Sequence, residues 1–115
     1  MPDLEMYRGN DRVFSLDITR GGYPINLTLA TLRFLARKSV TDPDVDAVIT
    51  KVTGAGIVTT DASNGMVDLE IASADTIGLY APTALVFDIE LTEGNGDIST
   101  PVQGVLLVKR TMIPL

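Results

Sequence analysis

The sequence predicts an all-β fold, an antiparallel sandwich or barrel of about seven strands. Three features of the chain indicate this class. Apolar and polar residues alternate in several short segments, as on strands with one buried and one wet face. Clusters of Gly, Pro, Asn and Asp separate these segments and mark turns. No segment keeps apolar residues at helical spacing for more than about two turns.

The longest pattern is a hairpin over residues 83–110, and much of the core is expected against its inner face. Asp88 and Glu90 fall on the outer side of its first strand. Residues 93–97 hold two glycines and an asparagine, which accept positive φ in tight turns. The apolar residues of the first strand fall on the inner side; they are Leu85, Phe87, Ile89 and Leu91.

The segments before residue 40 predict three strands. Met6 and Tyr7 form a short strand, and residues 8–11 form a turn. Residues 12–20 alternate, and residues 21–24 form the next turn. The inward residues of this strand are Phe14, Leu16 and Ile18.

Residues 25–28 are expected to form one helical or 3₁₀ turn capped by Asn26. Residues 31–38 are expected to form a strand with Arg33 and Arg37 outside. The inward residues of that strand are Leu32, Phe34 and Ala36.

The middle of the chain predicts a loop, three strands and a helical turn. Residues 40–46 are polar and acidic and form the loop, residues 47–53 an edge strand, and residues 57–60 a short strand. A turn centred on Asn64 and Gly65 leads to the strand at residues 66–72. The inward residues of this last strand are Val67, Leu69 and Ile71.

Residues 73–79 are expected to form a short helical turn capped by Ser73, which Pro82 separates from the long hairpin.

Length and composition indicate one domain over residues 1–115. Hydrophobic residues make up 45% of the chain and aromatic residues 5%, so the core is expected to be mainly aliphatic. The chain has no run of about 18 apolar residues, so no membrane span is expected. No secretory signal is visible in residues 1–15.

The chain contains no cysteine and no histidine. Disulfides, zinc sites built on Cys or His, haem held by His and nucleophiles activated by a His base are therefore excluded. Carboxylate pairs, Lys, Tyr and metals with oxygen ligands remain.

The net charge of −6 comes from 15 acidic and 9 basic residues. Such a balance disfavours nucleic acid as a partner, because the chain and the phosphates repel each other at long range. It fits either plain solubility or attraction to a basic partner surface.

Three short motifs fail as functional signatures. Asp42, Asp44 and Asp46 stand at alternate positions, as at the start of a calcium loop, but Ala47 and Thr53 occupy the required Gly and Glu places. A dinucleotide fingerprint opening at Gly54 and Gly56 has Thr59 at its third glycine place. Asn26 and Thr28 match a glycosylation acceptor, but no export signal accompanies them.

Asp88 and Glu90 on one strand face are the remaining carboxylate pair, of the kind that glycoside hydrolysis uses. The chain has no Trp for stacking on sugars, and Arg33 and Arg37 are expected to pair with such acids across the sheet. No catalytic, cofactor-binding or metal-binding residue is therefore predicted, and no cofactor.

The order of five segments resembles small bacteriophage and prophage proteins similar to the N-terminal domain of phage baseplate upper proteins. Tyr-Arg-Gly-Asn-Asp-Arg-Val-Phe-Ser-Leu stands at residues 7–16, and Pro-Ile-Asn-Leu-Thr-Leu-Ala-Thr-Leu-Arg-Phe at 24–34. Gly-Ile-Val-Thr-Thr-Asp-Ala-Ser-Asn-Gly-Met-Val follows at 56–67, Ser-Ala-Asp-Thr at 73–76 and Phe-Asp-Ile-Glu-Leu-Thr at 87–92. The resemblance covers nearly the whole chain and lies in order and spacing, since no single motif is specific.

The resemblance implies an immunoglobulin-like β-sandwich that serves as a structural, non-enzymatic protein of the virion, in the tail, neck or baseplate. Its expected partners are other virion proteins in multiple copies of a symmetric assembly, without nucleic acid or membrane, after synthesis in the host bacterial cytoplasm. Residues 79–87 lack the Gly-aromatic pair common in the family, and the further C-terminal portion of baseplate proteins is missing, which favours a small stand-alone component.

Three other functions remain open. One is a capsid decoration protein, and a second is a carbohydrate-binding module, which needs exposed aromatics grouped on one face; Tyr7, Tyr23 and Tyr80 are the tyrosines available. The third and least favoured is a small carboxylate-dependent hydrolase.

Beyond the short strand at Met6 and Tyr7, residues 1–9 and 109–115 alternate too little to predict strands of the isolated domain, yet they carry apolar side chains. They are expected either to dock on neighbours in an assembly or to pack back on their own sandwich. Their apolar members are Leu4, Met6, Tyr7, Met112, Ile113 and Leu115.

Overall fold

A computed structural model of the chain describes residues 3–39, 41, 43 and 47–110. The all-β prediction is confirmed, because helix is confined in these residues to the one-turn α1 (Ser73–Thr76) and the 3₁₀ turn η2 (Ala62–Asn64). Two short strands, β3 (Thr19–Arg20) and β4 (Tyr23–Pro24), pair with each other. The main strands are β1 (Asp3–Tyr7), β2 (Arg12–Asp17), β5 (Thr31–Arg37), β6 (Ile49–Thr53), β7 (Gly56–Asp61), β8 (Met66–Ile71), β9 (Thr83–Thr92) and β10 (Ile98–Lys109).

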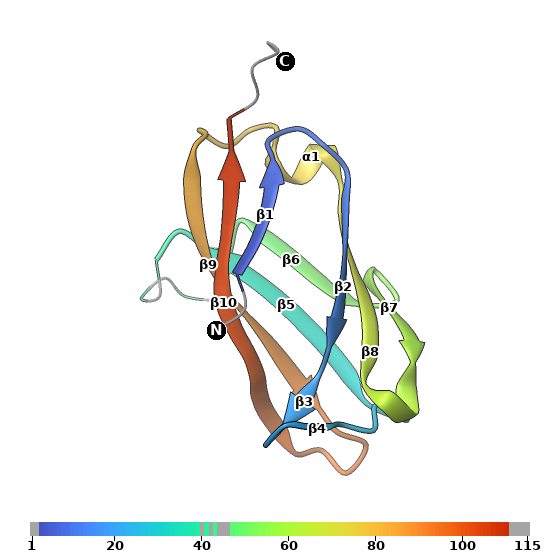
Figure 1. Cartoon of the computed structure of the whole chain (residues 1–115). Helices are drawn as coiled ribbons and strands as arrows, with labels where there is room; N and C mark the ends of the chain where they lie inside the picture. Colours follow the sequence, from blue (N-terminus) through green and yellow to red (C-terminus); the bar gives the residue numbers. More distant parts are fainter. Residues whose placement is uncertain (1–2, 40, 42, 44–46, 111–115) are drawn as a thin grey trace.

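The main strands pair in the order β1-β10-β9-β5-β6-β7-β8-β2. This row folds over where β6 meets β7, so that β1, β10, β9, β5 and β6 form a large sheet and β7, β8 and β2 a small one (Figure 1). The two groups match the C′CFG and BED sheets of an immunoglobulin domain, with β1 added beside the last strand. The predicted immunoglobulin-like β-sandwich is therefore confirmed.

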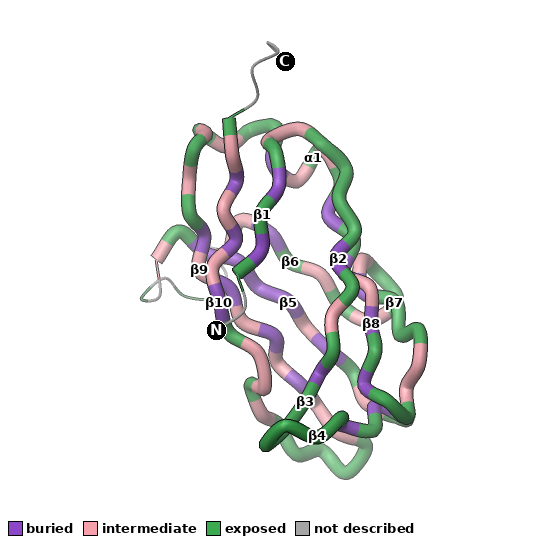
Figure 2. Tube along the Cα trace, viewed as in Figure 1, coloured by how far each residue is buried: buried purple, intermediate pink, exposed green. Residues whose placement is uncertain are grey.

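One core lies between the two sheets. It draws alternate residues from all eight main strands, which is possible only because the row of strands closes over itself. Figure 2 shows the buried positions following the inner sides of the strands. The predicted alternation of β9 is confirmed by the burial of Leu85, Phe87, Ile89 and Leu91.

The sheet is mixed, whereas the sequence predicted antiparallel pairing throughout. β1 runs parallel to β10, with Leu4 opposite Leu106 and Met6 opposite Val108. β6 and β7 are also parallel over their short contact, so β6 lies between β5 and β7 and is not the edge strand expected for residues 47–53. The pairing of β1 with β10 buries Leu4 and Met6 in the core, so residues 3–7 pack back on their own sandwich.

The long hairpin has the predicted bounds to within one residue. The Glu93 N–H donates to the Asp97 carbonyl at 2.9 Å across the turn, and β10 pairs with β9 antiparallel. The register shifts between Ser99 and Val102, which marks a β-bulge in the first half of β10.

Two predicted caps are wrong. Residues 25–28 form no helix, because the Asn26 side chain accepts the Thr28 N–H at 2.9 Å and closes a local turn instead. At the start of α1 the Asp75 carboxylate accepts the Ala72 N–H at 2.8 Å. Ser73 therefore does not cap α1; its N–H donates to Asp11 at 2.7 Å and ties α1 to the turn after β1.

Part of the predicted acidic loop, at residues 40, 42 and 44–46, lies outside the described residues, as do residues 1–2 and 111–115.

Candidate functional site

Two arginine–carboxylate pairs cross from β5 to β9 on the outer face of the large sheet. Arg33 stands directly opposite Glu90 in the register and approaches it at 3.4 Å. Arg37 lies diagonal to Asp88, and its Nη1 is 3.3 Å from Asp88 Oδ2. The predicted pairing of these arginines with acids across the sheet is therefore confirmed.

Arg37 corrects one prediction, since it was expected outside and is only 9% exposed. It points to the outer face as the alternation of β5 requires, but that face is itself covered at this position. Leu35, on the same face, is 3% exposed. Both sides of β5 are therefore largely buried, which an alternating pattern does not reveal.

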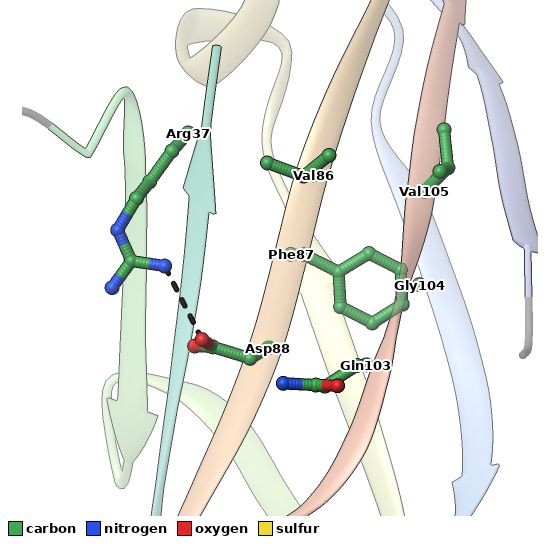
Figure 3. A pocket seen from close by; sticks show the side chains of 7 residues that line it. All are labelled: Arg37, Val86, Phe87, Asp88, Gln103, Gly104 and Val105. Carbon is green, nitrogen blue, oxygen red and sulfur yellow. Dashed lines mark hydrogen bonds and ion pairs between the residues drawn. The ribbon is translucent and has the colours of Figure 1, made fainter. Parts of the chain in front are cut away.

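A hollow of about 210 Å³ lies beside the Arg37–Asp88 pair (Figure 3). Arg37 reaches it from β5, Asp88 from β9 and Gln103 from β10. Val86 and Val105 line its other end. The hollow thus offers one ion pair and one amide at one end and two apolar side chains at the other.

The arrangement does not present a pair of catalytic carboxylates. Asp88 lines the hollow of Figure 3, whereas Glu90 faces a different depression, shared with Arg33. Each carboxylate also has its own arginine partner. Glycoside hydrolysis needs two carboxyl groups flanking one scissile bond, and these two do not face a common space.

The remaining motifs provide no site in the described residues. Asp42, Asp44 and Asp46 lie outside them, and no group of three Asp, Glu, Cys or His side chains in the described residues is placed to hold a metal ion. Gly54 and Gly56 have φ values of 87° and 104° and form the tight turn between β6 and β7. The turn leads directly into strand β7 instead of a helix, so it lacks the strand–turn–helix arrangement that binds a dinucleotide phosphate.

The three tyrosines do not form a platform. Tyr23 is 77% exposed in β4, and Tyr80 is 95% exposed in the connection after α1. These two elements lie at opposite ends of the sandwich (Figure 1). Tyr7, at the end of β1, has the Lys109 ammonium 4.5 Å from its ring centre. A carbohydrate-binding module of the kind considered above would group such rings on one face.

The sandwich is open along the side where β1 and β2 form the two ends of the strand order. β1 covers residues 105–109 of β10, and among the described residues β9 is the sole strand neighbour of residues 98–104. A groove of about 450 Å³ lies between this part of β10 and β2. It is lined by Ser15, Leu16, Asp17, Thr19, Thr100, Pro101, Val102 and Gln103, and is called the β2–β10 groove below.

The core reaches the surface in the β2–β10 groove. Leu16 and Val102 pack against the core but are only partly buried. Sequence reasoning placed Leu16 inward and missed the groove, because alternation assigns a face to a residue but not a neighbour to a strand edge. The bulge and Pro101 of β10 are the local signals that mark an edge.

No helix in the described residues is long and apolar enough to span a bilayer. No family model and no curated protein matches the chain. Among solved structures the chain is similar to murine CRIg, with 10% sequence identity, a TM-score of 0.44, and coverage of 95% of this chain and 92% of that one. The resemblance to baseplate upper proteins stays a prediction.

Proposed function

We propose that the chain is a structural, non-enzymatic protein of a bacteriophage particle that acts as an assembly scaffold in the tail, neck or baseplate. The observation that carries the contact role is the open side of the sandwich. There residues 98–104 of β10, which among the described strands pair with β9 alone, lie beside the partly buried Leu16 and Val102. The order of segments that resembles phage proteins supports the placement in a virion.

Uncovered strand edges favour contact with other chains. A strand edge presents unpaired backbone N–H and C=O groups, and a neighbouring chain can satisfy them. Covering Leu16 and Val102 would add a hydrophobic contribution of about 25 cal/mol per Å² of apolar area removed from water. The partners on this proposal are other virion proteins, in multiple copies of a symmetric assembly.

The charge of the chain supports protein partners. With a net charge of −6, it is repelled by nucleic acid and attracted to basic protein surfaces. The outward residues of the small sheet add to this, because Asp17, Asp68 and Glu70 stand on it at alternate strand positions. The protein would be made in the cytoplasm of the host bacterium and enter the particle there.

The test is cross-linking mass spectrometry on purified particles from the phage or prophage that encodes the chain. We expect the chain at a fixed copy number, with cross-links from β2 and β10 to tail, neck or baseplate proteins. Cross-links to the major capsid protein would instead identify a decoration protein. A chain that is abundant in the lysate and absent from purified particles would refute the virion role.

A further inference from the structure

In the β2–β10 groove, the edge of β10 is not paired with β1, as it is along residues 105–109. Along residues 105–109 of β10, strand β1 supplies a cover, and its Leu4 and Met6 are 8% and 2% exposed. Along residues 98–104 β9 is the sole described strand neighbour, and the Arg20 guanidinium of β3 donates to Ser99 Oγ at 3.3 Å near the start of β10. A second extended segment in line with β1 would complete the side of the sandwich.

We infer that the β2–β10 groove receives residues 110–115 of a second copy of this chain. These residues read Arg-Thr-Met-Ile-Pro-Leu. Extended, they span about 20 Å. The seven-residue stretch of β10 at 98–104, which has no described strand neighbour besides β9, has a similar length, about 23 Å.

The same segment cannot fill the groove of its own molecule. β10 runs from residues 98–104 toward Lys109, so the segment starts at the far end of that strand. To return from Lys109 to Gly104 it would cross about 17 Å along an edge that β1 already occupies. That distance uses nearly all of its length, so the donor is another copy.

The chemistry of the segment fits the groove. Met112 and Ile113 point to opposite sides of an extended segment, so one of these two apolar side chains can contact the exposed parts of Leu16 and Val102. Arg110 is exposed, and the groove carries Asp17 on its β2 wall.

The charges also select a direction. β2 ends at Asp17 near the start of β10, because β2 and β10 run in opposite directions along the groove (Figure 1). A segment lying parallel to β10, as β1 does, would place Arg110 near Asp17 and the apolar residues farther along.

Pro101 and the neighbouring bulge limit how the segment is held. Pro101 has no N–H, and the bulge breaks the regular ladder between Ser99 and Val102. Docking therefore depends on side chains that enter the groove more than on a continuous backbone ladder. A short donor with a proline of its own, Pro114, is compatible with such a site.

The contact is heterologous, because the donor segment and the acceptor groove are different surfaces. Repetition of such a contact gives a ring when the rotation closes and a filament when it does not. The inference concerns self-association of the purified chain and holds whether or not the chain is part of a virion.

The test is sedimentation velocity of the full chain up to about 1 mM. We expect association in the wild type and monomers after removal of residues 111–115 or in Met112→Asp/Ile113→Asp. Asp17→Lys and Arg110→Glu are each expected to weaken association about fivefold, as for an exposed ion pair, and their combination to restore it. Glu70→Lys, the same charge change on an exposed residue of β8, is the matched control and should leave association unchanged.

A peptide of sequence Lys-Arg-Thr-Met-Ile-Pro-Leu supplies a second readout. Added to the trimmed protein, it should shift the NMR signals of residues 15–17 and 100–103, whereas a scrambled peptide should not. A wild type that stays monomeric, association that survives the tail changes, or shifts confined to other residues would overturn the inference. Failure of the trimmed chain to fold would also overturn it, because the segment would then belong to its own core.

Discussion

At the scale of single residues, Phe87 illustrates how the core depends on one position. Its ring packs on Phe34 with centroids 5.2 Å apart, and the two side chains are 3% and 0% exposed. Both come from the centre of the large sheet, where β5 and β9 pair. Because a protein core is closely packed, neighbouring side chains cannot readily move to fill the cavity that a smaller residue would leave.

We expect Phe87→Ala to lower the free energy of unfolding by about 3–5 kcal/mol, because it removes a buried aromatic ring and leaves a cavity. Chemical denaturation measures the change. Tyr23→Ala is the control, since that side chain is 77% exposed and its loss should have little effect. A midpoint for Phe87→Ala equal to the wild type would contradict the burial of this face.

The fold alters the titration of Asp61. The Asn64 side-chain amide donates to its carboxylate at 2.8 Å and the Ser63 hydroxyl at 3.1 Å, and these bonds lower the pKa of Asp61 below its ordinary value of 3.8. Because the folded pKa is lower than the unfolded one, the resulting stabilisation is present above pH 3.8. It is lost as the pH falls through the folded pKa.

We expect an NMR titration of the Asp61 carboxyl carbon to give a midpoint below 3.8, and Asn64→Ala to move that midpoint upward. Asn64 is the informative position because its amide is the larger cause of the shift. An unchanged midpoint in Asn64→Ala would mean that the amide does not hold this carboxylate in solution.

At the scale of elements, the turn between β7 and β8 is hydrogen-bonded to Ile18, which lies between β2 and β3. Gly65 ends η2 with a φ of 67°. Its carbonyl accepts the Ile18 N–H at 2.7 Å, and a Cβ at Gly65 would lie 2.5 Å from the Ile18 carbonyl oxygen. Gly96 in the β9–β10 turn also has positive φ, 92°, but a Cβ there would meet open space.

We expect Gly96→Ala to cost about 1–2 kcal/mol, the usual penalty for a side chain in the left-handed region. Gly65→Ala should cost about 1–3 kcal/mol more, because its Cβ also displaces backbone. Thermal unfolding of the two variants measures the difference. Equal costs would show that the turn moves freely away from Ile18.

At the scale of the whole molecule, the arginine–carboxylate pairs bear on whether the chain performs chemistry. Asp88 and Glu90 each face an arginine rather than each other. We expect Asp88→Asn/Glu90→Asn to leave biological activity intact or to alter only assembly. Particle incorporation and a glycan-hydrolysis assay provide the two readouts. Glycan turnover by the wild type that disappears in this variant would contradict a non-enzymatic role.

The strands of the long hairpin follow from local patterns. Leu85, Phe87, Ile89 and Leu91 alternate with polar residues, and a strand places such residues on one face. Gly and Asn in residues 93–97 permit the tight turn that joins the strands. Alternation and turn chemistry are properties of neighbouring residues, so the folded context was not needed to locate β9 and β10.

Strand neighbours, and with them the candidate contact surface, depend on the whole fold. Alternation assigns each side chain a face but does not select a partner strand or its direction, so the parallel pairing of β1 with β10 was not predicted. The burial of Arg37 and the incomplete burial of Leu16 have the same origin. Each depends on what covers a sheet face or edge, and that cover comes from segments far away in the chain.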